Sequence, residues 1–238
     1  MTKSDVSKRS SDLLEGDIST TLKRMTIPMI LGMVMMMSFG LIDTFFVSLL
    51  GTDQLAAISF TFPVTFTVIS LNIGLGIGTA AVIGHLLGKN ELAKAKLTAT
   101  AALMTVFGLV GLLCILGYHT IPLIFSWLGA DDTLIPLIYE YMSIWYFAAV
   151  LLAIPMVGNS VLRAVGDTKS PSIIMASSGA LNALLDPLLI FGWGPVPALE
   201  IQGAAIATAI SWGVGVVWVL LLLHKRALMT ARLLNLKE

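Results

Sequence analysis

The stretch from position 25 to position 50, MTIPMILGMVMMMSFGLIDTFFVSLL, is an apolar run in which Asp43 is the only charged residue. The hydrocarbon core of a bilayer is about 30 Å thick and is crossed by about 20 apolar residues of helix. Five further runs of sufficient length follow, at 56–87, 97–118, 137–162, 172–191 and 204–223. The sequence therefore predicts an all-α membrane protein with six transmembrane helices.

The Lys and Arg residues predict the orientation of these helices. All 14 lie before the first run or after the second, fourth and sixth runs, and none follows the first, third or fifth. Loops rich in Lys and Arg stay in the cytoplasm. We therefore expect both termini to be cytoplasmic and the protein to be a multi-pass component of the cytoplasmic (inner) membrane.

The composition supports membrane insertion independently. With 57% hydrophobic and 12% charged residues, a chain of 238 residues has too little polar surface to cover a soluble globule. The formal net charge of zero indicates no nucleic-acid partner, so the lipid bilayer is the expected surrounding. Cys114, the single cysteine, lies within the third run and excludes an intrachain disulfide.

Loops between the runs are short, so no soluble domain is expected. Residues 1–24 are polar and of mixed charge, which predicts a cytoplasmic N-terminal segment and no cleavable signal peptide. Residues 25–223 are the predicted six-helix transmembrane lobe, and residues 224–238 are a predicted cytoplasmic tail.

Charged residues inside the runs are the candidate functional groups, because a buried ionisable group is costly in lipid. Asp43 lies in the first run, Asp186 in the fifth, and Glu140 near the outer start of the fourth, where it is expected to reach headgroups or water. At a rise of ~1.5 Å per residue, both aspartates lie about 10 Å below the outer ends of their helices. Equal depth predicts that the two carboxylates face one outward cavity.

Two neighbours of Asp186 add to this expectation. Asn182 lies one helical turn earlier and projects from the same face. Pro187 has no N–H and cannot donate to the carbonyl of Ala183, which is left for a proton, a water or a cation. The alternative for these polar groups is hydrogen bonding that merely holds the helices together.

Four stretches resemble one family of transporters. They are the first helix with Asp43 in residues 28–51, LRAVGDTKSP at 162–171, LNALLDPLLIFG at 181–192 and IQGAAIATAIS at 201–211. In order and spacing they resemble the multidrug and toxic compound extrusion (MATE) family of the MOP superfamily, and Asp186 beside Asn182 resembles its DinF-like branch.

The resemblance implies a twelve-helix transporter of two six-helix lobes that exports amphipathic, often cationic, compounds against inward flow of protons or sodium. It implies that Asp43, Asn182 and Asp186 form the cation site of the N-terminal lobe, with Tyr141 close by. This chain has the length of one lobe. Either it is a fragment of a longer transporter, or it pairs with another half, for which a parallel homodimer is geometrically allowed.

Several further residues have both a functional and a simpler interpretation. Met33, Met36 and Gly40 share a helix face with Asp43 and would suit an adaptable substrate wall, although lipid contact or core filling explains them as well. Pro28, like Pro187, is expected to kink its helix. Arg163, Asp167 and Lys169 are expected to form a cytoplasmic turn with a salt bridge, and His85 and His119 stand at no zinc spacing.

The expected function is transport without a cofactor, driven by a proton or sodium gradient, and not enzymatic catalysis. Two membrane aspartates could also activate water in an intramembrane protease, but neither lies in a suitable glycine motif. A lipid-linked precursor flippase of the same superfamily is an alternative, but it would line its cavity with basic residues, and no Lys or Arg lies in the predicted spans. A non-transporting fragment or partner subunit is the remaining alternative. Sodium is the only candidate metal, and its ligands would be Asp43, Asn182 and Asp186.

Overall fold

The computed structural model describes residues 17–229, except for the side chain of Met36. Within this part of the chain, six helices are long and apolar enough to cross a membrane. They are α2 (Ile18–Ser48), α3 (Thr52–Gly88), α4 (Leu92–His119), α6 (Ile135–Ala164), α7 (Lys169–Phe191) and α8 (Glu200–Lys225). Each contains one of the predicted spans, or all but its last two residues in the case of α2, so the all-α membrane fold is confirmed.

Helix α2 extends well beyond its apolar run at its N-terminal end, where a side chain caps it. Helix α2 begins at Ile18 because the carboxylate of Asp17 accepts a hydrogen bond from the backbone N–H of Thr20 at 2.9 Å. The basic residues at 23 and 24 therefore lie inside a helix, in the segment predicted to be cytoplasmic. One helix was not predicted, the short α5 (Ile121–Trp127). It has Pro122 in its first turn, where proline is well tolerated, and it is too short to cross a membrane.

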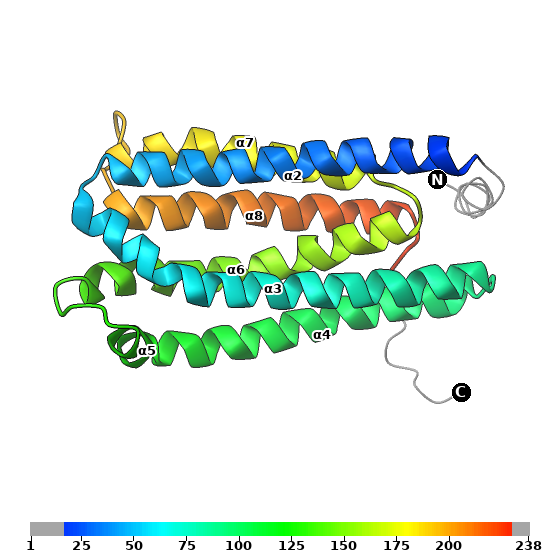
Figure 1. Cartoon of the computed structure of the whole chain (residues 1–238), viewed down its shortest axis with the longest axis horizontal. Helices are drawn as coiled ribbons and strands as arrows, with labels where there is room; N and C mark the ends of the chain where they lie inside the picture. Colours follow the sequence, from blue (N-terminus) through cyan, green and yellow to red (C-terminus); the bar gives the residue numbers. More distant parts are fainter. Residues whose placement is uncertain (1–16, 230–238) are drawn as a thin grey trace.

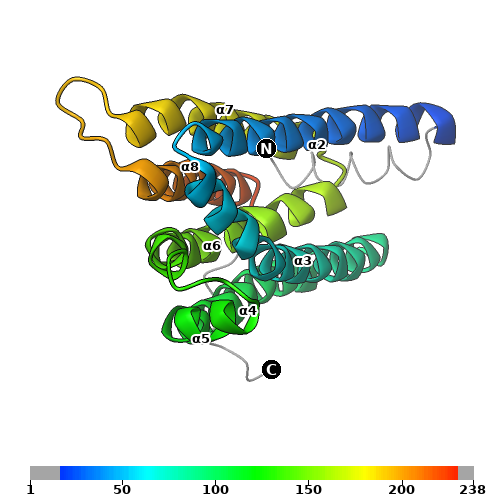
Figure 2. The ribbon, with the colours of Figure 1, turned by 60° about the vertical axis from the view of Figure 1, so that its left-hand side comes forward.

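Helix α6 is the centre of the bundle (Figure 1). It packs against α3 and α4 on one side and against α8 on the other, and α8 in turn packs against α7. Helix α2 completes the second group by packing along α7. Figures 1 and 2 both show α2 and α7 together beyond α8, and α3 and α4 together beyond α6.

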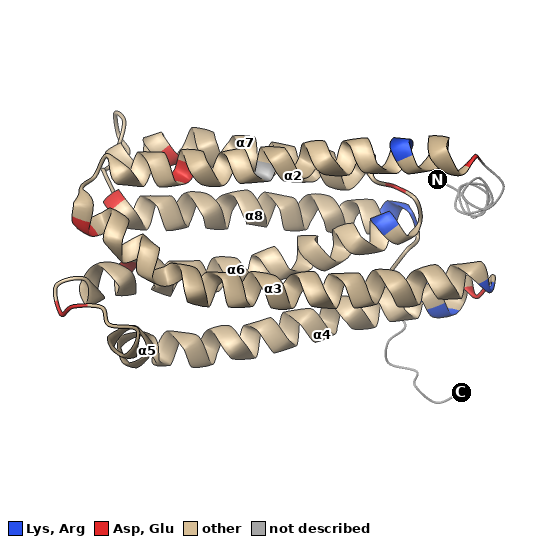
Figure 3. Cartoon of the chain, in the orientation of Figure 1, with Lys and Arg blue, Asp and Glu red and all other residues tan. Residues whose placement is uncertain are grey.

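The two ends of the bundle differ in the sign of their charged residues. The Lys and Arg residues of the described helices gather at the end where α2 begins and α8 ends, whereas Asp and Glu dominate the opposite end (Figure 3). Because cationic ends stay in the cytoplasm, this is the arrangement that the alternating loops predicted. The ends of α2 and α7 farther from the cationic end are thus the outer ends, and Figure 3 shows acidic residues within both helices near these ends.

Candidate functional site

Close packing of α2 on α7 brings the two membrane aspartates together. The ring of Phe39 lies over Gly179, so closely that an added Cβ there would lie 1.9 Å from the ring. Only glycine allows this approach, as is common between transmembrane helices. Asp43 follows Phe39 by one turn, and Asp186 lies two turns beyond Gly179, so the carboxylates come within electrostatic range of each other.

Asp186 is fully buried, and only one of its two carboxylate oxygens accepts a hydrogen bond from the described residues. The amide nitrogen of Asn182 donates to Asp186 Oδ1 at 3.2 Å and lies 3.4 Å from the hydroxyl oxygen of Thr208 on α8. Because Asn182 lies one turn before Asp186, both side chains leave the same face of α7. The site therefore joins α2, α7 and α8.

Two carboxylate oxygens of this site are buried and accept no hydrogen bond from the described residues. They are Asp43 Oδ1 and Asp186 Oδ2. Tyr141, on α6, is also buried, with 7% of its surface exposed. Buried polar atoms normally have partners, so these two oxygens are candidate positions for a bound proton or cation.

The structure does not bring every predicted residue into this cluster. Met33 is 57% exposed, and Gly40 has open space on its side-chain side. The side chain of Met36 lies outside the described part of the structure. Glu140 is exposed, as expected for a group that reaches headgroups or water.

The two predicted kink positions contain proline within a helix, at Pro28 in α2 and Pro187 in α7. The carbonyl of Pro28 accepts a hydrogen bond from the hydroxyl of Ser172 at 2.6 Å, which ties α2 to the first turn of α7. The structure also places Pro63 inside α3 and Pro155 inside α6, and neither was singled out as a kink position.

Thr208 is the residue of the cluster that the sequence analysis missed. It is a polar residue in the apolar run AIATAIS, and a single threonine in a membrane helix commonly bonds its own backbone. Thr61, Thr67 and Thr79 of α3 do this, with hydroxyls donating to carbonyls of α3 itself. Only the packing of α8 on α7 distinguishes Thr208 from them.

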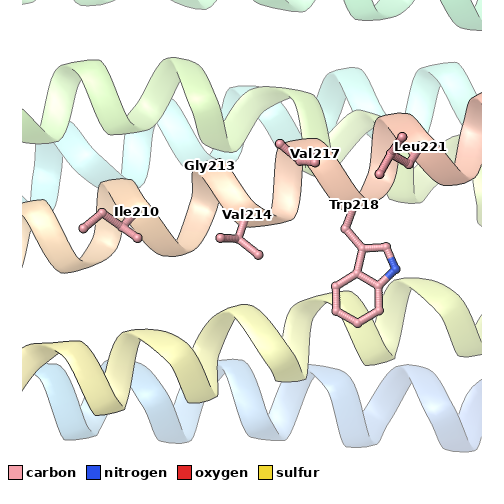
Figure 4. Close-up of a pocket in the computed structure, with 6 residues that line it drawn as sticks. All are labelled: Ile210, Gly213, Val214, Val217, Trp218 and Leu221. Carbon is pink, nitrogen blue, oxygen red and sulfur yellow. The ribbon is translucent and has the colours of Figure 1, made fainter.

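A groove of 460 Å³ lies elsewhere, along the exposed face of α8 (Figure 4). Its lining is apolar and comes from a single helix: Ile210, Gly213, Val214, Val217, Trp218 and Leu221. No carboxylate or amide lines it, so its side chains offer no oxygen ligand to a proton or a sodium ion. Among the described residues, no three His, Cys, Asp or Glu side chains gather as metal ligands.

The fold and the site together define a polytopic membrane protein of the transporter class. The MatE family model matches residues 28–188, a span that includes Asp43, Asn182 and Asp186. The chain belongs to this family of multidrug and toxic compound extrusion (MATE) transporters.

Two relatives show how wide the family is. The chain is 50% identical over 200 residues to the FAD transporter of Shewanella oneidensis, a match that covers 84% of this chain and 44% of the relative. It is 30% identical over 190 residues to the multidrug export protein MepA of Staphylococcus aureus, covering 78% of this chain and 41% of that protein.

Solved structures match the whole lobe. The Vibrio cholerae MATE transporter VcmN in the bent form matches with a TM-score of 0.84 and 32% identity, over 97% of this chain and 50% of that one. An outward-facing MATE transporter of the MOP superfamily matches with a TM-score of 0.85 and 31% identity, over 94% and 49%. The chain thus spans about half the length of the relatives it matches.

Proposed function

We propose that this chain forms one six-helix lobe of a cation-coupled antiporter that exports amphipathic compounds across the cytoplasmic membrane. The observation that carries the proposal is the pair of buried, unpartnered carboxylate oxygens on Asp43 and Asp186. They lie on two helices that pack along each other, close enough to interact. A site of this kind has one state with a cation bound and another without it.

Binding of the cation would change the packing of α2 against α7. Without it, the two carboxylates repel each other and attract water; with it, they are neutralised and can stay buried. A conformational change follows only if the two states bind the cation differently. The outward-facing and inward-facing forms of the lobe would meet that condition if the separation of Asp43 and Asp186 differs between them.

The coupling ion is a proton or sodium. A proton needs only the two carboxylates. Sodium needs several oxygen ligands, and the lobe offers Asp43, Asp186, the side-chain oxygens of Asn182 and Thr208, and the hydroxyl of Tyr141. Thr208 makes the sodium alternative stronger than the three residues inferred from sequence.

Two cargo classes have separate support. A lipophilic cation fits the acidic site, and the multidrug export protein among the relatives supports it. A flavin dinucleotide is the second candidate, because the FAD transporter is 50% identical over 84% of this chain. Its phosphates would need basic groups, and Arg163 is a half-buried Arg in a membrane helix of the described part. Arg163 lies in the last turn of α6, one residue beyond the predicted span 137–162, so the expectation that no Lys or Arg lies within a predicted span is unchanged.

The complete cavity requires a second set of helices facing this lobe. Either a second six-helix lobe within a longer protein or a second copy of this chain would supply it. The half-length coverage of the relatives supports a longer protein. A lipid-linked precursor flippase and a non-transporting partner subunit are the outcomes that a transport assay must separate from efflux.

Proteoliposomes containing the complete transporter with this lobe test the proposal. Efflux of a fluorescent lipophilic cation and of FAD is measured under an imposed proton gradient and, separately, under a sodium gradient. We expect one gradient to drive export of at least one cargo, and Asp43→Asn to abolish this coupling. Glu140→Gln, at an exposed carboxylate, is the matched control and should retain it. Gradient-driven efflux by Asp43→Asn at the parent rate would remove Asp43 from the mechanism.

A further inference from the structure

An ion pair joins two distant parts of the lobe at its cytoplasmic end. Arg226, the residue directly after α8, contacts the carboxylate of Asp167 in the loop between α6 and α7. Both side chains are largely buried, at 14% and 5% exposure. Lys94 and Glu91 also form an ion pair in the described part of the chain, but this pair is exposed and lies at the start of α4.

Helix caps fix the positions of both partners. Gly166 ends α6 in the left-handed region, with φ 80°, and the N–H of Asp167 donates back to the carbonyl of Leu162 at 3.0 Å. Ala227 ends α8 in the same way, with φ 51°, and the N–H of Leu228 donates to the carbonyl of Leu223 at 2.9 Å. The two charges are therefore held by backbone structure.

Asp167 also holds the first turn of α7. Its carboxylate accepts hydrogen bonds from the N–H of Ser170 at 3.1 Å and from the Ser170 hydroxyl at 2.7 Å. Arg226 donates to the same hydroxyl at 2.9 Å. One junction thus connects the end of α6, the start of α7 and the end of α8.

The same two helices, α7 and α8, meet again at the candidate cation site. There Asn182 contacts Thr208, and farther out the N–H of Leu199 donates to the carbonyl of Leu189 at 2.9 Å. Asn182 lies about 22 Å from Asp167 along α7, at ~1.5 Å per residue. The antiparallel pair is therefore tied by polar contacts at its cytoplasmic end and again at the site.

We propose that the Asp167–Arg226 pair is a positioning clamp that sets the register of α8 against α7 and so places Thr208 opposite Asn182. Apolar packing between helices is not directional, and a shift of one turn along the axis replaces one apolar ridge by the next. A buried ionic contact that can form in a single register removes that freedom, which is the best-attested role of such groups. The clamp itself is independent of transport; its effect on coupling rests on the proposed function.

A cysteine pair reports the register directly. Ser178 on α7 and Gly215 on α8 face each other, because a Cβ on Gly215 would lie 3.1 Å from the Ser178 hydroxyl oxygen. The full chain with Cys114→Ser, Ser178→Cys and Gly215→Cys is oxidised in membranes, and the rate of disulfide formation is measured. We compare this parent with Arg226→Gln and Asp167→Asn, and with Lys94→Gln as the matched control at the exposed ion pair.

We expect Arg226→Gln and Asp167→Asn to slow cross-linking by about 3- to 30-fold, the range typical for coupling through such contacts. Lys94→Gln should leave it unchanged, and Arg226→Lys, which keeps the charge but has one nitrogen in place of the two that contact Asp167 and Ser170, should restore part of the rate. In the complete transporter, the same loss should raise the half-saturating concentration of the driving cation while cargo affinity changes less. Parent cross-linking rates in both neutral variants would overturn the clamp.

Folding defects are separated from a register effect by Arg226→Lys. If Arg226→Gln does not accumulate in membranes, a faster cross-linking rate in Arg226→Lys than in Asp167→Asn supports the clamp. Equal losses in Arg226→Lys and Arg226→Gln would overturn it, because charge would then not be the property that matters. Altered cross-linking in a protein that transports neither cargo would reject the proposed function and leave the clamp standing.

Discussion

Gly203, in the first turn of α8, lies tightly against the backbone near the end of α7, and Gly203→Ala tests how far the site depends on this contact. An added Cβ would lie 2.5 Å from the carbonyl oxygen of Leu189, 2.6 Å from its carbonyl carbon and 2.8 Å from the nitrogen of Ile190. All three atoms are backbone, so no side chain can rotate away. Ordinary contact begins at 3.4 Å, and α8 must therefore retreat by about 0.9 Å.

The retreat has two calculable effects. Overpacking of this kind costs about 1–3 kcal/mol, and the gain in helix propensity from glycine to alanine offsets about 1 kcal/mol of it. Weakening of the Leu199–Leu189 backbone hydrogen bond adds about 1 kcal/mol. We therefore expect a net loss of about 1–3 kcal/mol. The contact between Asn182 and Thr208, already 3.4 Å long, would no longer be a hydrogen bond.

Thermal unfolding in detergent and the cation dependence of transport are the two measurements. A loss of this size lowers the Tm by about 2–4 °C per kcal/mol for a chain of this length. Gly84→Ala in α3 is the matched control, since nothing lies within 4 Å of its added Cβ. It should keep or slightly raise the Tm. If Gly203→Ala is as stable as Gly84→Ala and shows an unchanged cation dependence, close contact at Gly203 does not position the site.

Three further predictions concern the site and the lobe as a whole. Asp186→Ala should reduce export more than Glu140→Ala does, because Asp186 is fully buried and Glu140 is exposed. A drug-resistance assay at matched expression measures this. The reverse order would assign the coupling role to Glu140. Thr208→Val should raise the half-saturating sodium concentration of sodium-driven transport by about tenfold, which is the effect of losing one ligand or hydrogen bond of ~1.4 kcal/mol. Proton-driven transport should be nearly unchanged. Equal effects on sodium-driven and proton-driven transport would argue against Thr208 as a ligand. The chain expressed alone should insert with both ends in the cytoplasm yet confer little drug resistance. Reporter fusions after Glu238 and within residues 193–202 measure the orientation, and a susceptibility assay measures the resistance. Export of a dye by the isolated chain, with cross-linking that shows a symmetric pair, would favour a homodimer.

The number of spans and their direction could be predicted because the bilayer imposes them one segment at a time. Each helix must satisfy its own backbone hydrogen bonds in lipid, so length and apolarity are sufficient evidence. The position of Lys and Arg residues in alternate loops needs no knowledge of packing. Helix α5 was missed for the same reason: a run too short to span carries no such constraint.

A common depth for the functional groups could be predicted from sequence, but their neighbours could not. The rise per residue predicts that Asp43 and Asp186 lie at one level, and this stays a prediction. That α2 lies along α7 depends on Phe39 filling the space over Gly179, a contact between residues far apart in the chain. Thr208 gave no signal of its own, because hydroxyls in membrane helices commonly bond the backbone.

The cytoplasmic turn shows the same division most clearly. A charged turn at LRAVGDTKSP could be expected from its residues, and Gly166 in the left-handed region and Asp167 at the start of α7 fulfil that expectation. The ion-pair partner of Asp167 described here, however, is Arg226, 59 residues away. Sequence alone determined what each helix is and where its charges lie, since those properties depend on local composition and on the membrane. Only the tertiary structure decided which helices touch, because side-chain shape at their contacts, Gly179 and Gly203 above all, sets that choice.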